Sequence, residues 1–238
     1  MNPTRRIATV TGVLFLVTEV SAIAGLALYS PVLKGADYVL GAGADTRIFL
    51  GAMCELILAL AVIGTAATLY PIIRRQHEGV ALGHVCARLA EAAVIIVGII
   101  SVLAVVTLRQ DMTGAAGTDA ASLSTAANAL IAVHDWTFVF GPGFLLGVNT
   151  TLLAYLMYRS ALVPRFIAVL GLVGGPLIFL GAVAVTFGVY EQADPVGLLV
   201  ALPVFAWEVT FAIRLIPRDS TPRPSSSRAF GPSARTPL

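Results

Sequence analysis

Residues 80–108 read VALGHVCARLAEAAVIIVGIISVLAVVTL, and the fold class follows from this segment. An apolar run of this length can cross the roughly 30 Å hydrocarbon core of a bilayer as a helix that rises about 1.5 Å per residue. His84, Arg88 and Glu91 interrupt the run at spacings that place them on one helical face. A charge at the bilayer centre costs about 2.5–3.5 kcal/mol, so these residues mark a candidate functional site.

The composition of the whole chain is that of a polytopic membrane protein. Its 238 residues are 58% hydrophobic and 12% charged, with a mean hydropathy of +0.90, whereas a soluble domain carries about 25% charged residues. The net charge of +2 is too small to indicate a nucleic-acid-binding protein. Cys54 and Cys86 fall inside apolar stretches, so we interpret them as small buried apolar residues rather than a disulfide or a metal pair.

We expect an all-α bundle of six transmembrane helices that forms a single domain over residues 1–216, followed by a disordered tail over 217–238 that is rich in Pro and Ser. The first apolar run is too long for a signal peptide, so we expect a retained helix. Residues 122–135, of mixed polarity, are expected to stand above the bilayer or to form a separate helix. Pro142 and Pro176 are expected to interrupt the fourth and fifth helices. The helices are predicted at 7–30, 48–73, 80–108, 125–158, 164–190 and 195–216.

The charges in the loops and termini predict the orientation. One side of the predicted bundle carries eleven basic residues, whereas the other carries Lys34, Arg47 and Arg109 together with most of the loop acids. The positive-inside rule then predicts that both termini are cytoplasmic. We expect the protein to lie in the inner (plasma) membrane of the cell. The eleven residues are Arg5, Arg6, Arg74, Arg75, Arg159, Arg165, Arg214, Arg218, Arg223, Arg228 and Arg235.

Four glutamates, Glu19, Glu55, Glu91 and Glu208, also fall inside predicted spans. Counting about 1.5 Å per residue from the cytoplasmic helix ends places Arg88 and Glu208 about 12 Å deep, and the deepest acid, Glu55, about 22 Å deep. Four helices therefore contribute ionisable groups to one band around the midplane. One arginine cannot pair with four acids, and a buried carboxyl without a partner is favoured in its neutral form, which can donate a proton. We therefore predict these four glutamates as catalytic residues.

A purely structural role for Arg88 is the alternative. A guanidinium has five donors and can hold two carboxylates, so Arg88 with Glu208 and either Glu91 or Glu55 would tie three helices together. In both interpretations Arg88 and His84 bind or position other groups and do not perform the chemistry.

A second candidate site is the sequence His134-Asp135-Trp136 at the outer end of the fourth predicted helix. Adjacent helical residues point about 100° apart, so His134 and Asp135 are not a ready-made catalytic dyad. We interpret Asp135 as a binding or positioning residue and Trp136 as an anchor at the membrane interface. The sequence shows no His-rich metal motif, phosphate-binding glycine loop, nucleophile elbow or haem attachment motif, so we expect no metal and no cofactor.

Several short stretches, distributed up to Ile216, match one family pattern in combination. They are 12–16 (GVLFL), 50–52 (LGA) ahead of Glu55, 69–71 (LYP), 79–83 (GVALG) with Arg88 and Glu91, 135–138 (DWTF), 158–160 (YRS), 163–165 (VPR) and Glu208. Together they resemble the bacterial membrane-protein family catalogued as domain of unknown function 4386. The resemblance supports the six-helix layout and implies no activity.

Two function classes account for the band of acids, with a third as a fallback. The first is an intramembrane enzyme in which Glu91 or Glu55 protonates a lipophilic, isoprenoid or lipid-like substrate, with Trp207, Phe205 and Phe179 shaping the pocket. Small membrane terpene cyclases are similar in size and layout alone. The second is a proton- or ion-coupled transporter, acting as a homodimer. The third is a non-catalytic component that binds membrane lipid or a partner helix. Because the band is central, we favour the enzyme.

Overall fold

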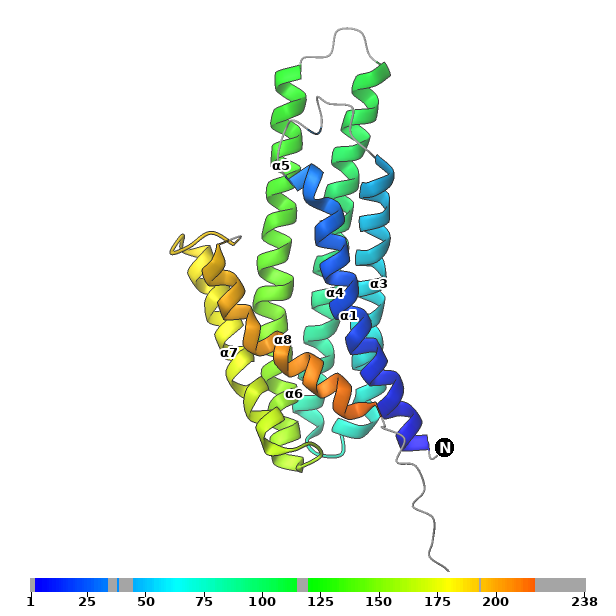
Figure 1. The fold of residues 1–238 in the computed structure, drawn as a ribbon, viewed down its shortest axis with the longest axis vertical. Helices are drawn as coiled ribbons and strands as arrows, with labels where there is room; N and C mark the ends of the chain where they lie inside the picture. The colour runs from blue at the N-terminus through cyan, green and yellow to red at the C-terminus, as the bar shows by residue number, and fades with distance from the viewer. Residues whose placement is uncertain (1–2, 34–37, 39–44, 115–119, 193, 217–238) are drawn as a thin grey trace, which may run out of the picture.

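In a computed structural model the chain forms a bundle of long helices, and no strand occurs among the described residues, which are 3–33, 38, 45–114, 120–192 and 194–216 (Figure 1). Six stretches of this part are long and apolar enough to cross a membrane, which confirms the predicted all-α, six-helix fold. The predicted tail at 217–238 lies outside the described residues. The elements are α1 (Pro3–Leu33), α3 (Asp45–Ile73), α4 (Glu78–Gly114), α5 (Ala120–Phe138), the π-helical segment η1 (Val139–Leu145), α6 (Leu146–Ser160), α7 (Arg165–Thr186) and α8 (Pro195–Leu215).

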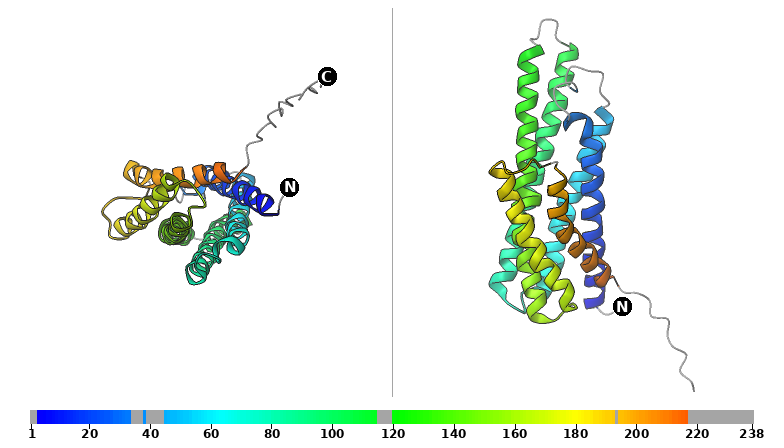
Figure 2. Two further views of the ribbon diagram at one scale, coloured as in Figure 1. Left: turned by 90° about the horizontal axis from the view of Figure 1, so that it is seen from below. Right: turned by 60° about the vertical axis from the view of Figure 1, so that its left-hand side comes forward.

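The helices are arranged as a ring in which each one packs on the next. α1 packs on α3, α3 on α4, α4 on the continuous α5–η1–α6 stretch, α6 on α7, and α7 on α8. α8 returns to α1 and closes the ring, as the view along the bundle shows (Figure 2). Side chains that point inward from helices far apart in sequence can therefore meet inside the bundle.

Pro142 and Pro176 have different effects on their helices. At Pro142 the backbone changes from α to π geometry over η1, which confirms the predicted interruption. A proline has no N–H to donate to the preceding turn, and a local π segment is one way for a helix to absorb that loss. α7, in contrast, continues as one helix from Arg165 to Thr186 with Pro176 inside it. The predicted interruption at Pro176 is therefore wrong.

The fifth predicted helix ends at Thr186 and not at residue 190. Gly188 adopts the left-handed conformation with φ 71°. Its N–H donates to the carbonyl of Val185, and the N–H of Val189 donates to the carbonyl of Ala184, each at 2.9 Å. This is the Schellman arrangement, which ends helices at a glycine. The apolar sequence continues past this point, but the backbone hydrogen bonds end the helix.

Two parts of the bundle differ in length. α7 and α8 have 22 and 21 residues, which corresponds to about 32 Å at 1.5 Å per residue, close to the hydrocarbon thickness. α4 has 37 residues, or about 55 Å, and α4 and α5 rise well beyond the loop that joins α7 to α8 (Figure 1). The first turns of the fourth predicted helix accordingly belong to a continuous α5 that extends past this loop.

A polar contact joins α3 and α4 on the extended side of the bundle. The hydroxyl of Tyr38 donates to Asp45 at 2.7 Å, Arg109 forms an ion pair with Asp45, and the Arg109 guanidinium lies 5.2 Å from the centre of the Tyr38 ring. Burial, together with the hydrogen bond to Asp45, raises the pKa of Tyr38 to about 12. The phenol is therefore a hydrogen-bond donor throughout the physiological pH range.

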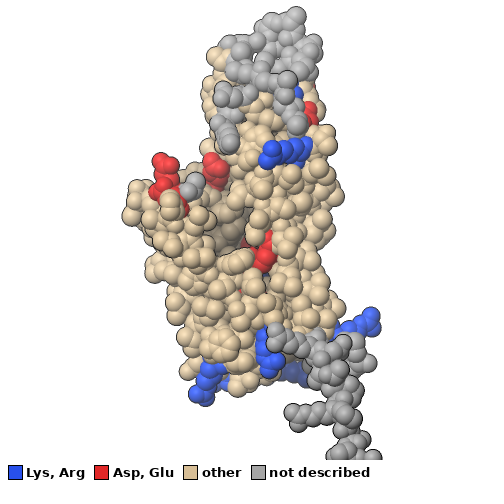
Figure 3. All heavy atoms as spheres, viewed as in Figure 1, with Lys and Arg blue, Asp and Glu red and all other residues tan. Residues whose placement is uncertain are grey.

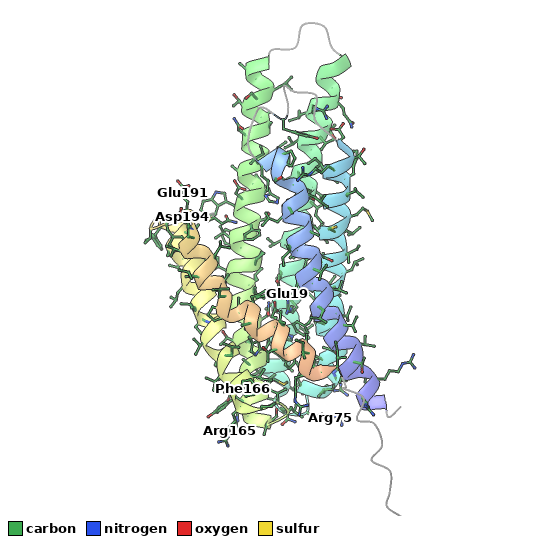
Figure 4. All side chains as sticks on the ribbon, in the orientation of Figure 1. Glu19, Arg75, Arg165, Phe166, Glu191 and Asp194 are labelled. Atoms are coloured by element: carbon green, nitrogen blue, oxygen red, sulfur yellow. The ribbon has the colours of Figure 1, made fainter. Side chains whose placement is uncertain are left out.

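The two ends of the bundle differ in charge. Basic atoms gather at one end in the space-filling view, whereas acidic atoms lie on the α7–α8 loop (Figure 3). Arg75 and Arg165 lie at the first end, and Glu191 and Asp194 lie on the α7–α8 loop, away from that end (Figure 4). We call these the basic end and the acidic end. α1 begins and α8 finishes at the basic end, as an even number of spans requires (Figure 1).

The apolar core consists of two clusters, one nearer each end. On α1, Phe15 belongs to the cluster at the basic end and Tyr29 to the other; on α4, Ala81 and Ala92 are divided in the same way. Arg88 lies between the last two in sequence. Along α4, Arg88 therefore lies between the two apolar clusters.

Candidate functional site

The site is built around the buried side chain of Arg88, which is 1% exposed. Its Nη2 donates to Glu208 of α8 at 2.9 Å, and its Nη1 donates to Glu91, one turn along α4, at 3.3 Å. The guanidinium also lies 5.2 Å from the centre of the Phe15 ring on α1. Arg88 thus links α4 to α8, and the predicted pairing with Glu208 and Glu91 is confirmed.

Asn149 of α6 completes the environment of Glu91, and the sequence analysis missed it. Its amide nitrogen donates to Glu91 at 2.7 Å and to the carbonyl of Leu145 at 2.9 Å, and the residue is fully buried. The backbone carbonyl of Asn149 accepts from Nδ1 of His84 at 3.1 Å. An amide inside an apolar run was the sequence signal that could have identified it.

Glu19 lies where α1 and α8 separate. Near the basic end the two helices touch, because a Cβ on Gly12 would lie only 2.7 Å from the carbonyl oxygen of Ala212. α8 then leans away from α1 toward α7, and the surface between them is hollowed, with acidic atoms at the edge of the hollow (Figures 1 and 3). Glu19 lies beside α8 (Figure 4), is partly buried, and places its carboxyl next to that of Glu208. We refer to Glu19, His84, Arg88, Glu91, Asn149 and Glu208 as the Arg88 cluster.

An aromatic stack supports the Arg88 cluster from the basic end. Trp207 is fully buried and stacks on Phe211, with ring centres 5.2 Å apart and planes 6° apart. Both rings meet the Phe15 ring edge-on, at 6.3 Å and 5.4 Å, and Phe15 in turn lies against Arg88. Trp207 therefore positions the cluster through Phe15, and it is packed within the core.

Phe179 and Phe205, the other aromatic residues predicted to shape the pocket, belong to α7 and α8. Phe179 packs edge-on against Phe144, with ring centres 5.1 Å apart. Phe205 is 41% exposed on the surface of the bundle. Trp136 is 47% exposed, a position that suits an interface anchor.

Glu55 belongs to a second group of residues, nearer the acidic end. Its side chain packs against Gly25 of α1, and its carboxyl lies near the Tyr29 hydroxyl and His134. Nδ1 of His134 lies 3.5 Å from Oδ1 of Asp135. We call Tyr29, Glu55, His134 and Asp135 the Glu55 cluster. The predicted single band of acids is therefore two sites, and Tyr29 is a further member that the sequence analysis missed.

Several buried polar atoms of the two clusters have no hydrogen-bond partner within the described part of the chain. Buried polar groups are paired in the great majority of cases. Each of these residues belongs to one of the two clusters or is the sequence neighbour of a member. The atoms are Tyr29 Oη, His84 Nε2, Arg88 Nε, His134 Nδ1, Asn149 Oδ1, Thr150 Oγ1 and Trp207 Nε1. The two clusters thus have more hydrogen-bonding capacity than a closed structural clamp uses.

These features define a polytopic helical membrane protein whose core contains a buried arginine–carboxylate cluster that borders a lateral hollow. The chain matches the family described as domain of unknown function DUF4386 over residues 10–218, and it belongs to that family. The resemblance noted from the sequence is therefore confirmed. No curated protein and no solved structure matches the chain.

Proposed function

We propose that this protein is an intramembrane enzyme that protonates a lipophilic substrate, isoprenoid or lipid-like, at the Arg88 cluster. The observation that carries the proposal is the position of Glu19 beside Glu208, at the edge of the hollow between α1 and α8. A molecule dissolved in the bilayer can reach such a hollow from the side. Three carboxyls surround one guanidinium, so the cluster has more acid than Arg88 can neutralise.

The contacts favour Glu19 over Glu91 and Glu55 as the proton donor. Glu91 accepts hydrogen bonds from both Arg88 and Asn149, which suits a carboxylate and not a carboxylic acid. Glu55 lies in the other cluster. Two adjacent carboxyls in an apolar environment do not both ionise readily, so Glu19 and Glu208 are suited to share one proton.

The corresponding step is an acid-initiated addition. The shared proton forms a C–H bond with one carbon of a double bond by using its π electron pair, and the other carbon becomes cationic. A second double bond of the same molecule then forms a C–C bond to that carbon, and loss of a proton to the carboxylate restores the acid. The carboxylates of Glu208 and Glu91 lower the energy of the cation, and Arg88 holds them in position.

Proton-coupled transport is the second candidate, and the position of the Glu55 cluster supports it. This cluster adds titratable groups nearer the acidic end, so ionisable residues occupy two levels of the bundle. In that case the protein would act as a homodimer. For both candidates we propose that the basic end faces the cytoplasm and that the protein lies in the plasma membrane, because basic loops are retained on the cytoplasmic side.

The first test is mass spectrometry of small molecules that co-purify with wild-type protein in mild detergent, compared with the Glu19→Gln variant. Glu191→Gln is the matched control, because Glu191 is exposed at the acidic end (Figure 4). Candidate substrates are then incubated with each protein in detergent without any gradient. The enzyme proposal predicts a specific lipophilic ligand and turnover that Glu19→Gln abolishes and Glu191→Gln preserves. Absence of turnover combined with Glu19-dependent proton flux in liposomes would favour transport. Unchanged behaviour of both Glu19→Gln and Glu208→Gln in all assays would reduce the cluster to a structural clamp.

A further inference from the structure

The Glu55 cluster has its own architecture, independent of the Arg88 cluster. Three helices contribute to it: α1 provides Tyr29, α3 provides Glu55, and α5 provides His134. The His134 ring meets the Tyr29 ring edge-on, with centres 5.7 Å apart. A phenol, a carboxyl and an imidazole, which can all exchange protons, are thus held together inside an apolar bundle.

Glycines allow the helices to approach closely around these side chains. A Cβ on Gly25 would lie 2.8 Å from Cγ of Glu55, and a Cβ on Gly51 would lie 2.7 Å from the Tyr29 ring. Either substitution would therefore force the facing side chain to move. The backbone is packed directly against the polar groups.

The exposed fraction of the side chains decreases from Asp135 to His134 to Tyr29. The side chain of Asp135 is 58% exposed, and that of His134, which is 3.5 Å away through Nδ1, is 5% exposed. Tyr29 is fully buried. Its hydroxyl is directed toward Glu55, and neither this hydroxyl nor His134 Nδ1 has a hydrogen-bond partner among the described residues. The cluster thus connects an accessible carboxyl to a partly buried one through groups that retain unused hydrogen-bonding capacity.

We propose that the Glu55 cluster is a proton-transfer site that connects the aqueous surface near the acidic end with the interior of the bundle. Asp135 takes a proton from water and passes it to Nδ1 of His134. The imidazolium releases its other ring proton to the Glu55 carboxylate, and the neutral imidazole returns to its starting tautomer by rotation or by exchange with water. Charge and protons balance, because one proton enters at Asp135 and one arrives at Glu55.

Titratable groups face Glu55 from two neighbouring helices. Tyr29 faces it from α1 and His134 from α5, whereas Gly98 of α4 packs against His134. Cys54 precedes Glu55 on α3 and also lies near Tyr29. His134 is thus a titratable group that lies near Glu55 and also contacts the exposed Asp135.

The inference does not depend on the proposed enzyme. Glu55 packs against Gly25, which lies six residues beyond Glu19 on α1, or about 9 Å along the helix. A proton on Glu55 could therefore serve the Glu19–Glu208 pair or a transport cycle. The transfer from the surface to Glu55 is a property of this cluster alone.

The test is time-resolved infrared spectroscopy of the full chain in lipid nanodiscs after a pH jump. The carbonyl band that disappears in Glu55→Gln reports protonation of Glu55. His134→Phe retains a ring against Tyr29 but removes both nitrogens, and Trp136→Phe is the control at a neighbouring aromatic position. We expect the Glu55 band to form about 100-fold more slowly in His134→Phe, in the range by which positioned proton-transfer groups act, and at the wild-type rate in Trp136→Phe.

Asp135→Asn provides a second measurement, and we expect this variant to fold because the side chain is largely exposed. It should slow the same band about tenfold, less than His134→Phe, because the imidazole that passes the proton on to Glu55 is retained. Wild-type rates in folded His134→Phe and Asp135→Asn would overturn the proposal. So would a Glu55 band that does not respond to pH in the wild-type protein. If His134→Phe does not fold, the rate in Asp135→Asn decides the question.

Discussion

Replacing Arg88 with methionine should destabilise the bundle strongly, because it leaves two buried carboxyls without their cation. Arg88 donates to Glu208 at 2.9 Å and to Glu91 at 3.3 Å, and it is 1% exposed. Removing one partner of a buried ion pair costs about 3–5 kcal/mol in soluble proteins. Hydrogen bonds between membrane helices average only about 0.6 kcal/mol. Since the lost contacts are ionic and two in number, we expect a loss of about 3 kcal/mol.

The explanation also predicts the effect of a compensating variant. In Arg88→Met combined with Glu91→Gln and Glu208→Gln, no unpaired charge remains, so most of the lost stability should return, to within about 1 kcal/mol of wild type. Arg75→Met, at an exposed position of the basic end, is the matched control and should have little effect.

The assay is unfolding in mixed micelles, followed by tryptophan fluorescence in a Trp136→Phe background. The chain has two tryptophans, so this background isolates Trp207, which packs on Phe15 beneath Arg88. The reasoning fails if Arg88→Met costs less than about 1 kcal/mol. It also fails if the triple variant is no more stable than the single one, because the unpaired charges would then not be the cause.

Three further predictions follow from the packing and the charge distribution. Gly12→Ala should destabilise the protein by about 1–3 kcal/mol by overpacking the contact between α1 and α8, whereas Gly79→Ala, whose Cβ would lie 3.5 Å from its nearest neighbour, should be tolerated; thermal unfolding in detergent compares them. Asn149→Leu should cost about 1–3 kcal/mol because a buried carboxylate loses a donor, and the same unfolding assay should show no such loss if that hydrogen bond is unimportant. In intact cells, a cysteine replacing Glu191 should react with a membrane-impermeant thiol reagent and one replacing Arg165 should not; the reverse result would invert the proposed orientation.

The membrane class and the number of helices could be read from local sequence. Apolar runs long enough to span a bilayer form helices because backbone groups in hydrocarbon must be hydrogen-bonded within the segment. The distribution of arginines likewise predicted which helix ends lie on the same side of the bundle. The structure places Arg75 and Arg165 at the same end, the basic end (Figure 4). The boundary at Thr186 was predicted less well, because it depends on the backbone conformation at Gly188 and not on hydropathy.

The pairing of Arg88 with Glu91 was accessible to the sequence, because the two residues lie one helical turn apart. Glu208 on α8 was also predicted as a partner and lies within 2.9 Å, but the choice between Glu91 and Glu55 as the second partner was left open until the structure placed Glu91 at 3.3 Å. The depth of a residue, counted along its own helix, does not specify which side chains of the neighbouring helices point toward it. For the same reason Asn149 was missed, and Glu55 was assigned to a group that it does not join.

The sequence by itself therefore determined that this is a six-helix membrane protein with ionisable groups at mid-depth, because the transfer cost of polar groups into hydrocarbon acts on each segment separately. Only the tertiary structure decided how those groups divide. The close approach at Gly12, the lean of α8 toward α7 and the resulting hollow at Glu19 arise from contacts between helices far apart in the chain. Such contacts depend on the shapes of two helix surfaces at once. The hydropathy and residue spacing of one segment do not determine the surface of the segment that packs against it.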